Sequence, residues 1–368
     1  MYINKHLKLF TLLFFLVFAA RTTLSCTVPV FQYAMERWNQ SFYDGVLFYK
    51  GSLSEEEKET FAAFQEMLSK GNSVLNLRIE KLDVESNPDQ YEQLLQDNKP
   101  GKLPALALWY PREKGSSDPF WISPLQSPVL ENIVNSGKRS ELSSHLVEGS
   151  PVVWILVQPA GQTDKDETVV RLEEGIAKTV KNMKQNPRFK NLLKSEEGEV
   201  SFPVVKVSAD NASEVVLLSM ITGLKEGAEI NKSLVIPVFG RGRALTTFTA
   251  DKISQEMIYN IMSFLLSPCA CQIKMASPGT DMLVKANWEK AFNQYSQQTS
   301  SPTLTGVMPD SSSTSASTIT AENDSIIDLT TDQNTSFFSS KIMSTTGSII
   351  GILVVVIGVA TVIVLKRR

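Results

Sequence analysis

Histidine is nearly absent from this sequence, which has only two histidines among its 368 residues, His6 and His145. Zinc sites and hydrolytic triads depend on histidine, and no acidic cluster here has the spacing of a metal-ligand set. The Gly-x-Ser-x-Gly elbow of serine hydrolases is missing as well. The scarcity of histidine therefore argues against zinc hydrolysis and against serine hydrolase chemistry.

An excess of charge of one sign is also lacking. The 36 lysines and arginines nearly balance 39 aspartates and glutamates, which gives a formal net charge of −3. A protein that binds nucleic acid usually presents a basic surface to the phosphates. Nucleic acid is therefore not expected as a partner.

Phosphate-binding loops have no counterpart either. The nearest candidate, Gly240-Arg241-Gly242-Arg243, lacks the third glycine and the Lys-Ser/Thr pair of nucleotide motifs. This segment is interpreted as a hairpin turn between two strands, with both arginines pointing outward.

Cysteine is scarce, but two of the three cysteines, Cys269 and Cys271, are separated by one alanine at the end of a helical run over 253–266. Three interpretations are open. A disulfide between residues two apart would be strained, and strained disulfides are typically oxidising and used in exchange. Two thiolates could instead hold copper(I). The pair could also be structural, as a disulfide or as two reduced thiols that close the helix.

The first 25 residues have the features of a secretory signal: basic residues, then an apolar run over 9–20, then short polar residues. Cleavage after residue 25 would leave Cys26 at the mature N-terminus, where a bacterial lipoprotein carries its acyl chains. Such signals usually have leucine three residues before the cysteine, whereas Leu24 lies two before it. Lipidation of Cys26 is therefore one of two open alternatives.

The C-terminal part predicts a membrane anchor. Residues 345–365 carry no charge and are long enough to span a bilayer, and the basic residues 366–368 should stay in the cytoplasm. Residues 293–344 are rich in serine and threonine and read as a disordered tether. The bulk of the chain is thus expected outside the cytoplasm, on the periplasmic side of a cell membrane.

Between these ends the sequence predicts two similar α/β halves, residues 26–148 and 149–292. Each alternates apolar strands with helices in the order β-α-β-α-β-β-α. In the first half the strands are expected at 45–49, at 74–84, within 101–111 and near 120–122. In the second half they are expected at 152–157, 202–207 and 233–246, the last range being two strands around the Gly240 turn.

The segment Leu103-Pro104-Ala105-Leu106-Ala107-Leu108-Trp109 resembles the thioredoxin superfamily, in which a cis-proline begins the third strand and faces the active-site cysteines. The resemblance implies a tandem thioredoxin-like fold with candidate cis-prolines at Pro104 and, in Ile-Pro-Val-Phe of the second half, at Pro237. The superfamily's Cys-x-x-Cys belongs at 50–55 and 158–163, and neither place contains cysteine. Its disulfide-exchange activity therefore does not carry over.

A closer resemblance is to uncharacterised, envelope-anchored bacterial proteins with tandem thioredoxin-like halves. It rests on the segments 26–38, 237–245, 268–272 and 278–283, and it brings no known activity. The leading hypothesis is a non-catalytic binding or accessory module, anchored in the membrane by its C-terminal helix, with other envelope proteins as partners and no cofactor. The alternative is a thiol-disulfide oxidoreductase or copper-handling protein that uses Cys269 and Cys271.

Overall fold

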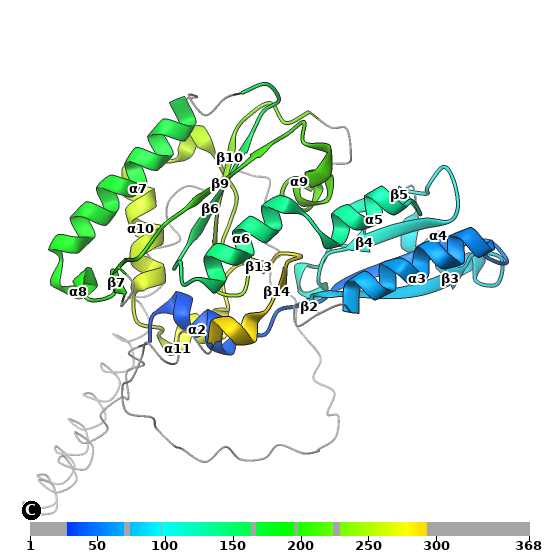
Figure 1. The fold of residues 1–368 in the computed structure, drawn as a ribbon, viewed down its shortest axis with the longest axis horizontal. Coiled ribbons are helices and arrows are strands. Elements are labelled where there is room, and N and C mark those ends of the chain that lie inside the picture. Colours follow the sequence, from blue (N-terminus) through cyan, green and yellow to red (C-terminus); the bar gives the residue numbers. More distant parts are fainter. Residues whose placement is uncertain are drawn as a thin grey trace, which may run out of the picture. The chain divides into compact units, whose positions relative to one another are not determined.

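The computed structural model describes residues 28–292 except 70–73, 97, 163–166, 196–197 and 224–228. A helix, α2 (Val30–Arg37), comes first (Figure 1). The elements of the first half follow: β1 (Tyr43–Tyr49), α3 (Glu55–Ser69), β2 (Val74–Leu75), β3 (Leu77–Asp83), α4 (Pro88–Leu95), β4 (Ala105–Trp109), η1 (Arg112–Lys114), β5 (Trp121–Pro124), α5 (Ser127–Val134) and α6 (Gly137–Val147).

The second half contains more short elements than the first. It consists of β6 (Val153–Gln158), α7 (Glu167–Gln185), α8 (Pro187–Lys190), β7 (Lys194–Ser195), β8 (Gly198–Glu199), β9 (Val204–Ser208), η2 (Ala212–Glu214), α9 (Val215–Thr222), β10 (Leu234–Phe239), β11 (Arg243–Ala244), β12 (Phe248–Thr249), η3 (Ala250–Lys252), α10 (Gln255–Leu266), α11 (Cys271–Ala276), β13 (Thr280–Asp281) and β14 (Lys285–Ala286).

Each half contains one mixed sheet, and the two sheets share a pairing pattern. In the first, the order is β3-β1-β4-β5, with β1 parallel to β3 and the other neighbours antiparallel. In the second, β6 is parallel to β9 and antiparallel to β10, and β11 and β13 extend the sheet beyond β10. Helices connect the parallel pairs, as a crossover between parallel strands requires. The predicted α/β architecture of two similar halves is confirmed at this level.

The sequence predicted one strand over 74–84, but Asn76 divides it into β2 and β3. The reason is that the two pieces have different partners. Residues from Leu77 onward pair with β1, whereas Leu75 pairs with Lys285 of β14 in the second half. Asn76 lies between them and is only 2% exposed.

Apolar strands and amphipathic helices build the core. All six residues of β6 and all five of β4 are buried, which fits strands covered on both faces. Helix α7 buries one face through residues spaced three or four apart, Val169, Leu172, Ile176, Thr179 and Met183. It lies beside α10, where Gly175 leaves no room for a side chain because a Cβ there would be 2.6 Å from Ile258 Cδ1 (Figure 1).

The first and last segments of the described region each pack against the half that is more distant in sequence. Helix α2, which precedes the first half in sequence, packs against α10 and β10 of the second half. Strand β14, near the end of the second half, pairs with β2 of the first. The sequence-based boundary at 148/149 therefore separates the two sheets but not all the segments that pack on them.

Within the described residues, no helix is both long and apolar enough to cross a membrane. The predicted signal (1–25), Cys26, the tether (293–344), the span (345–365) and the tail (366–368) all lie outside those residues.

Candidate functional site

The turn between β1 and α3 is the place where the first half would carry thioredoxin cysteines. Its residues are polar and form a helix start instead: Glu57 N donates to Ser54 Oγ at 3.2 Å, and Ser54 N donates to Glu57 Oε2 at 2.8 Å. This reciprocal pair is a capping box. Gly51 N donates to Asp83 Oδ1 at 2.9 Å. Hydrogen bonds from the Ser86 hydroxyl and from Gly51 lower the pKa of Asp83. The turn offers no nucleophile for disulfide exchange.

The peptide bond Leu103–Pro104 is cis, and it lies directly before β4. Pro104 O accepts a hydrogen bond from Leu125 N at 2.9 Å. Pro104 therefore occupies the strand start at which the thioredoxin resemblance places a cis-proline.

Pro237 occupies a different place. It lies inside β10, opposite Trp154 of β6, and Ile236–Pro237 is not among the cis bonds of the described chain. On its other side β10 pairs with β11 and β12, which leave a gap over residues 245–247. Proline has no N–H to donate to a neighbouring strand. Because the pairing on this side of β10 is interrupted at Pro237, the strand can accommodate a proline there.

The turn after β6, residues 158–162, holds the corresponding place in the second half. Ser233, just before β10, donates its hydroxyl to Gln162 Oε1 at 3.2 Å. The backbone of Gly161 has φ +76° and open space around it. This turn too is polar and contains no cysteine.

Cys269 and Cys271 lie far from that turn. Helix α7 starts near the turn, and its 19 residues make it about 28 Å long. Arg188, which follows the far end of α7, donates to the hydroxyl of Ser267 at 2.9 Å. The cysteine pair therefore lies near the opposite end of α7, so the fold does not bring it to the thioredoxin position.

The two cysteines also differ from each other. Cys269 is fully buried, and its N–H donates to Val28 O at 2.8 Å. Cys271 is exposed at the first position of α11. Their sulfurs are not bonded to each other. Ala270 between them is extended, with φ −74° and ψ 159°. Of the two, only Cys271 is accessible to another molecule.

The arginines of the Gly240 turn point inward, so the prediction that both point outward is wrong. Arg241 donates to Met35 O at 2.6 Å and to Glu36 O at 3.2 Å. These are the last carbonyls of α2, which lack partners inside the helix, and burial lowers the pKa of Arg241. Arg243 donates to Asp281 Oδ1 at 3.1 Å. Local sequence did not reveal these contacts because both partners are distant in the chain.

Segments that are distant in sequence pack closely around this turn. A Cβ at Gly240 would be 2.7 Å from Ala34 Cβ, and one at Gly279 would be 2.5 Å from Ala244 O. The guanidinium of Arg243 lies over the Trp38 ring, 5.4 Å from its centroid. The turn is thus packed between the end of α2 and the segment before β13.

Buried polar residues that sequence reasoning missed connect the halves. Arg139 of α6 donates to Leu283 O at 2.8 Å and to Asn132 O and Ile133 O, each at 2.7 Å. Burial lowers its pKa to about 10, although the nearby Glu214 carboxylate opposes that shift. Glu214 itself accepts hydrogen bonds from the Ser136 hydroxyl and from Lys138 N, so it too joins the second half to the first.

Asn76 and Tyr110 add neutral hydrogen bonds at the same junction. Asn76 Nδ2 donates to Ser41 O at 2.8 Å and to Met282 O at 3.1 Å, and its Oδ1 accepts from Val284 N at 3.0 Å. The Tyr110 hydroxyl donates to Met220 O of α9 at 2.8 Å. Each residue joins backbone of the second half to a side chain of the first.

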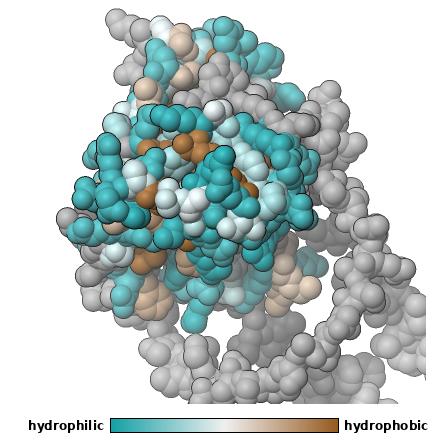
Figure 2. All heavy atoms as spheres, turned by 90° about the vertical axis from the view of Figure 1, so that its right-hand side faces the viewer, coloured by the Kyte–Doolittle hydropathy of each residue, from teal (hydrophilic) through white to brown (hydrophobic). Residues whose placement is uncertain are grey.

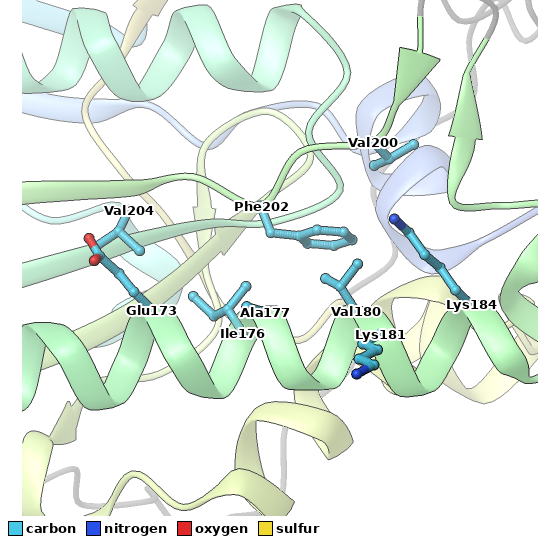
Figure 3. Close-up of a pocket in the computed structure, with 9 residues that line it drawn as sticks. All are labelled: Glu173, Ile176, Ala177, Val180, Lys181, Lys184, Val200, Phe202 and Val204. Carbon is cyan, nitrogen blue, oxygen red and sulfur yellow. The ribbon is translucent and has the colours of Figure 1, made fainter.

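A groove of about 530 Å³ runs along α7. Figure 3 shows the Phe202 ring above Ile176 and Val180, with Lys184 beyond them. Two ion pairs flank the groove: Lys184 Nζ is 2.6 Å from Glu199 Oε2, and Lys206 Nζ is 3.0 Å from Glu173 Oε1. Its volume is that of a small-ligand site, but its lining is largely apolar and has no set of converging catalytic groups. The groove can hold apolar groups.

No known protein family matches the chain, and no curated protein matches it. Among solved structures, the zinc-bound form of human ERp44 matches at 10% identity and a TM-score of 0.19, over 64% of this chain and 59% of that one. The first two thioredoxin domains of Naumovozyma dairenensis Eps1p match at 12% identity and a TM-score of 0.20, over 66% of this chain and 97% of that one. This chain thus spans less than two thirds of the ERp44 chain.

The two sheets themselves define the class of the protein. Each sheet has a parallel pair joined by a helical crossover, followed by antiparallel strands, as in a thioredoxin-like domain. The chain is an α/β protein whose two mixed sheets are consistent with tandem thioredoxin-like domains.

Proposed function

We propose that the protein is a non-catalytic binding or accessory module of the cell envelope, with its two thioredoxin-like halves outside the cytoplasm and its C-terminal helix in the membrane. One observation carries the proposal. The two turns at which this fold performs disulfide exchange contain polar, helix-capping and turn-forming residues without cysteine.

The connections between the halves support the same function. The hydrogen bonds of Arg139, Glu214, Asn76 and Tyr110 hold the first half against the second. Such contacts hold the two halves in a fixed arrangement. They favour a protein with a preformed binding surface over an enzyme whose halves open during a reaction cycle. The face shown in Figure 2 is mostly hydrophilic with a small apolar area, as expected of a surface that meets water and contacts partners transiently.

The membrane location rests on the uncharged residues 345–365 and the basic residues 366–368. It is tested by adding protease to spheroplasts that express the full chain with an N-terminal and a C-terminal epitope. Digestion from outside should remove the bulk of the protein and leave a C-terminal fragment protected. A chain that becomes accessible only after lysis would contradict this location.

The non-catalytic role is tested on the detergent-solubilised full chain by insulin reduction and by refolding of a scrambled disulfide substrate. We expect the wild type and the Cys271→Ser variant to match the rate without protein. Thiol-dependent turnover that is lost in Cys271→Ser would instead support the oxidoreductase alternative. Copper that stays with the wild type after dialysis, and not with the variant, would support the copper alternative.

A further inference from the structure

Strand β3 forms one edge of the first sheet. Within the described residues it pairs with β1 alone, and this pairing covers the whole of Leu77–Asp83. The outer side of an edge strand presents N–H and C=O groups that act as a template for another strand. The opposite edge, β5, is shorter and ends at Pro124, which has no N–H to donate. Of the two edges of this sheet, β3 is therefore the better template.

The pairing with β1 decides which backbone groups of β3 face outward. Tyr43 N donates to Asn76 O at 2.9 Å where the pair begins. In a parallel pair every second residue bonds to the neighbouring strand, so the even-numbered residues from Asn76 onward face β1. Leu77, Ile79 and Lys81 therefore direct their N–H and C=O groups away from β1. Within the described chain, no other strand pairs with them.

The charged side chains of β3 complement a second copy of the same strand. Arg78 and Glu80 are two residues apart, so they point to the same face of the sheet, and both are exposed. The Arg78 guanidinium lies 4.2 Å from the centroid of the Phe42 ring, which supports it on that face. Opposite charges that face each other across two strands stabilise the pair, whereas like charges destabilise it. The alternation of sign along β3 thus favours one register of self-pairing.

That register follows from placing the centre of a symmetric antiparallel pair on each residue in turn. A centre on Ile79 places Arg78 opposite Glu80 of the second copy, and Glu80 opposite Arg78 of that copy. A centre on residue 78 or 80 places two like charges opposite each other. A centre on residue 81 places both charged residues opposite apolar ones. The charges therefore favour the register centred on Ile79.

We propose that two copies of the protein form a dimer by pairing their β3 strands in antiparallel orientation, with Ile79 at the twofold axis. The outward backbone groups fit this register. Ile79 exchanges two hydrogen bonds with Ile79 of the second copy, and Leu77 and Lys81 of each copy exchange bonds with Lys81 and Leu77 of the other. The facing Arg78 and Glu80 then occupy positions without ladder bonds, where Cα atoms are about 4.5 Å apart and side chains are closest. The two four-stranded sheets join into one.

The contact involves only five residues of each strand, so the dimer should be reversible and should depend on concentration. Anchoring of both copies in one membrane would raise their effective concentration and favour the pair. The inference goes beyond the proposed function and does not depend on it, because the β3 edge uses neither the thioredoxin turns nor the cysteines.

The test measures the mass of the detergent-solubilised full chain by sedimentation over a series of concentrations. The wild type should approach the mass of two chains. Glu80→Arg and Arg78→Glu each place like charges opposite each other twice, so each variant alone should have a dissociation constant at least about tenfold higher. An equimolar mixture of the two variants should dimerise again, because one copy then carries two arginines at the facing positions and the other carries two glutamates.

Hydrogen exchange over residues 77–83 locates the contact. The outward N–H groups of Ile79 and Lys81 should exchange slowly in the wild-type dimer and fast in either variant alone. A wild type with the mass of one chain at every concentration would overturn the proposal and leave the edge to a strand of another protein. A dimer in which 77–83 exchanges as fast as in Glu80→Arg would also overturn it, since another surface would then hold the copies together. If a variant fails to fold, exchange of the wild type at high and low concentration decides the same question.

Discussion

All six residues of β6 in the second half are buried, whereas its counterpart β1 in the first half has three of its seven residues partly exposed. The two sheets pair their strands alike, so topology does not explain the difference. The second sheet receives α6 and α2 from segments that precede it in the chain, in addition to its own α7 and α10. Coverage by borrowed helices, and not strand order, makes the second half the more buried one.

The exchange in the other direction involves shorter segments. The first half receives the short strand β14, the carbonyls of the segment before it, which Arg139 and Asn76 bind, and the contacts of α9 with α5 and β5. We therefore expect the second half to be the stable body and the first half to depend on the buried polar contacts at the junction. The predictions that follow test this dependence, from the largest effect to the smallest.

Replacing Arg139 by alanine should have the largest effect. The change leaves three buried backbone carbonyls without their charged donor. Hydrogen bonds to a charged group contribute about 1.5–3 kcal/mol each, so we expect a loss of about 3–5 kcal/mol in the free energy of unfolding. Urea unfolding followed by tryptophan fluorescence should show this loss and a first transition confined to the first half. Lys138→Ala, the neighbour whose ion pair with Glu141 is partly exposed, is the control and should lose little. Equal losses in both variants would contradict the role of Arg139.

Asn76→Ala should come next. It removes three hydrogen bonds to Ser41, Met282 and Val284 and leaves buried backbone groups unpaired. The expected loss of unfolding free energy is about 2–3 kcal/mol. Asn87, whose amide donates to Asp83 O on the exposed side of the first half, is the matched control. If Asn87→Ala costs as much as Asn76→Ala, the junction does not depend on the Asn76 side chain.

Gly240→Ala tests the contact of α2 with the second half. Both Gly240 and Gly161 have positive φ, but only at Gly240 would a Cβ meet another atom, Ala34 Cβ at 2.7 Å. Gly161→Ala measures the backbone cost alone. Thermal unfolding should show Gly240→Ala to be less stable than Gly161→Ala by about 1–3 kcal/mol because of the added overlap. A difference near zero would mean that α2 shifts without cost.

The smallest effect should be the pH dependence of Tyr110. Burial raises its pKa to about 12, so the folded protein holds the neutral phenol while the unfolded chain ionises near pH 10. Its contribution to stability is therefore complete below about pH 10 and is lost as the pH rises toward 12. Tyr110→Phe should cost about 1 kcal/mol at pH 7 by removing the bond to Met220 O. Between pH 10 and 12 the unfolding free energy of Tyr110→Phe should fall less than that of the wild type. If the two proteins lose stability equally over this range, Tyr110 is not the titrating group.

The sequence predicted the elements well where the signal is local. Continuous apolar runs predicted β4 and β6, and a helical repeat with acidic residues at its start predicted α7, because burial on one or both faces imposes a period on nearby residues. The pattern over 74–84 was misread as one strand, since nothing local shows that Leu75 and Leu77 pair with different parts of the chain.

The candidate site was less predictable. The absence of cysteine from both thioredoxin turns can be read directly from the sequence, and so can the pair at 269 and 271. Cys269 bonds to Val28, and Arg241 bonds to the end of α2, both more than 200 residues earlier in the chain, whereas Arg243 bonds to Asp281, 38 residues later. A single sequence carries no local signal for such a contact.

The sequence alone determined the two-half α/β organisation, the order of the elements and the lack of exchange cysteines in the turns, because periodicity and residue identity are local properties. The tertiary structure decided which helices cover which sheet, which polar residues hold the halves together, and which cysteine is accessible. These features depend on surfaces that meet only after the chain has folded. Close packing between two distant segments produces no periodic pattern of apolar residues in the sequence of either segment.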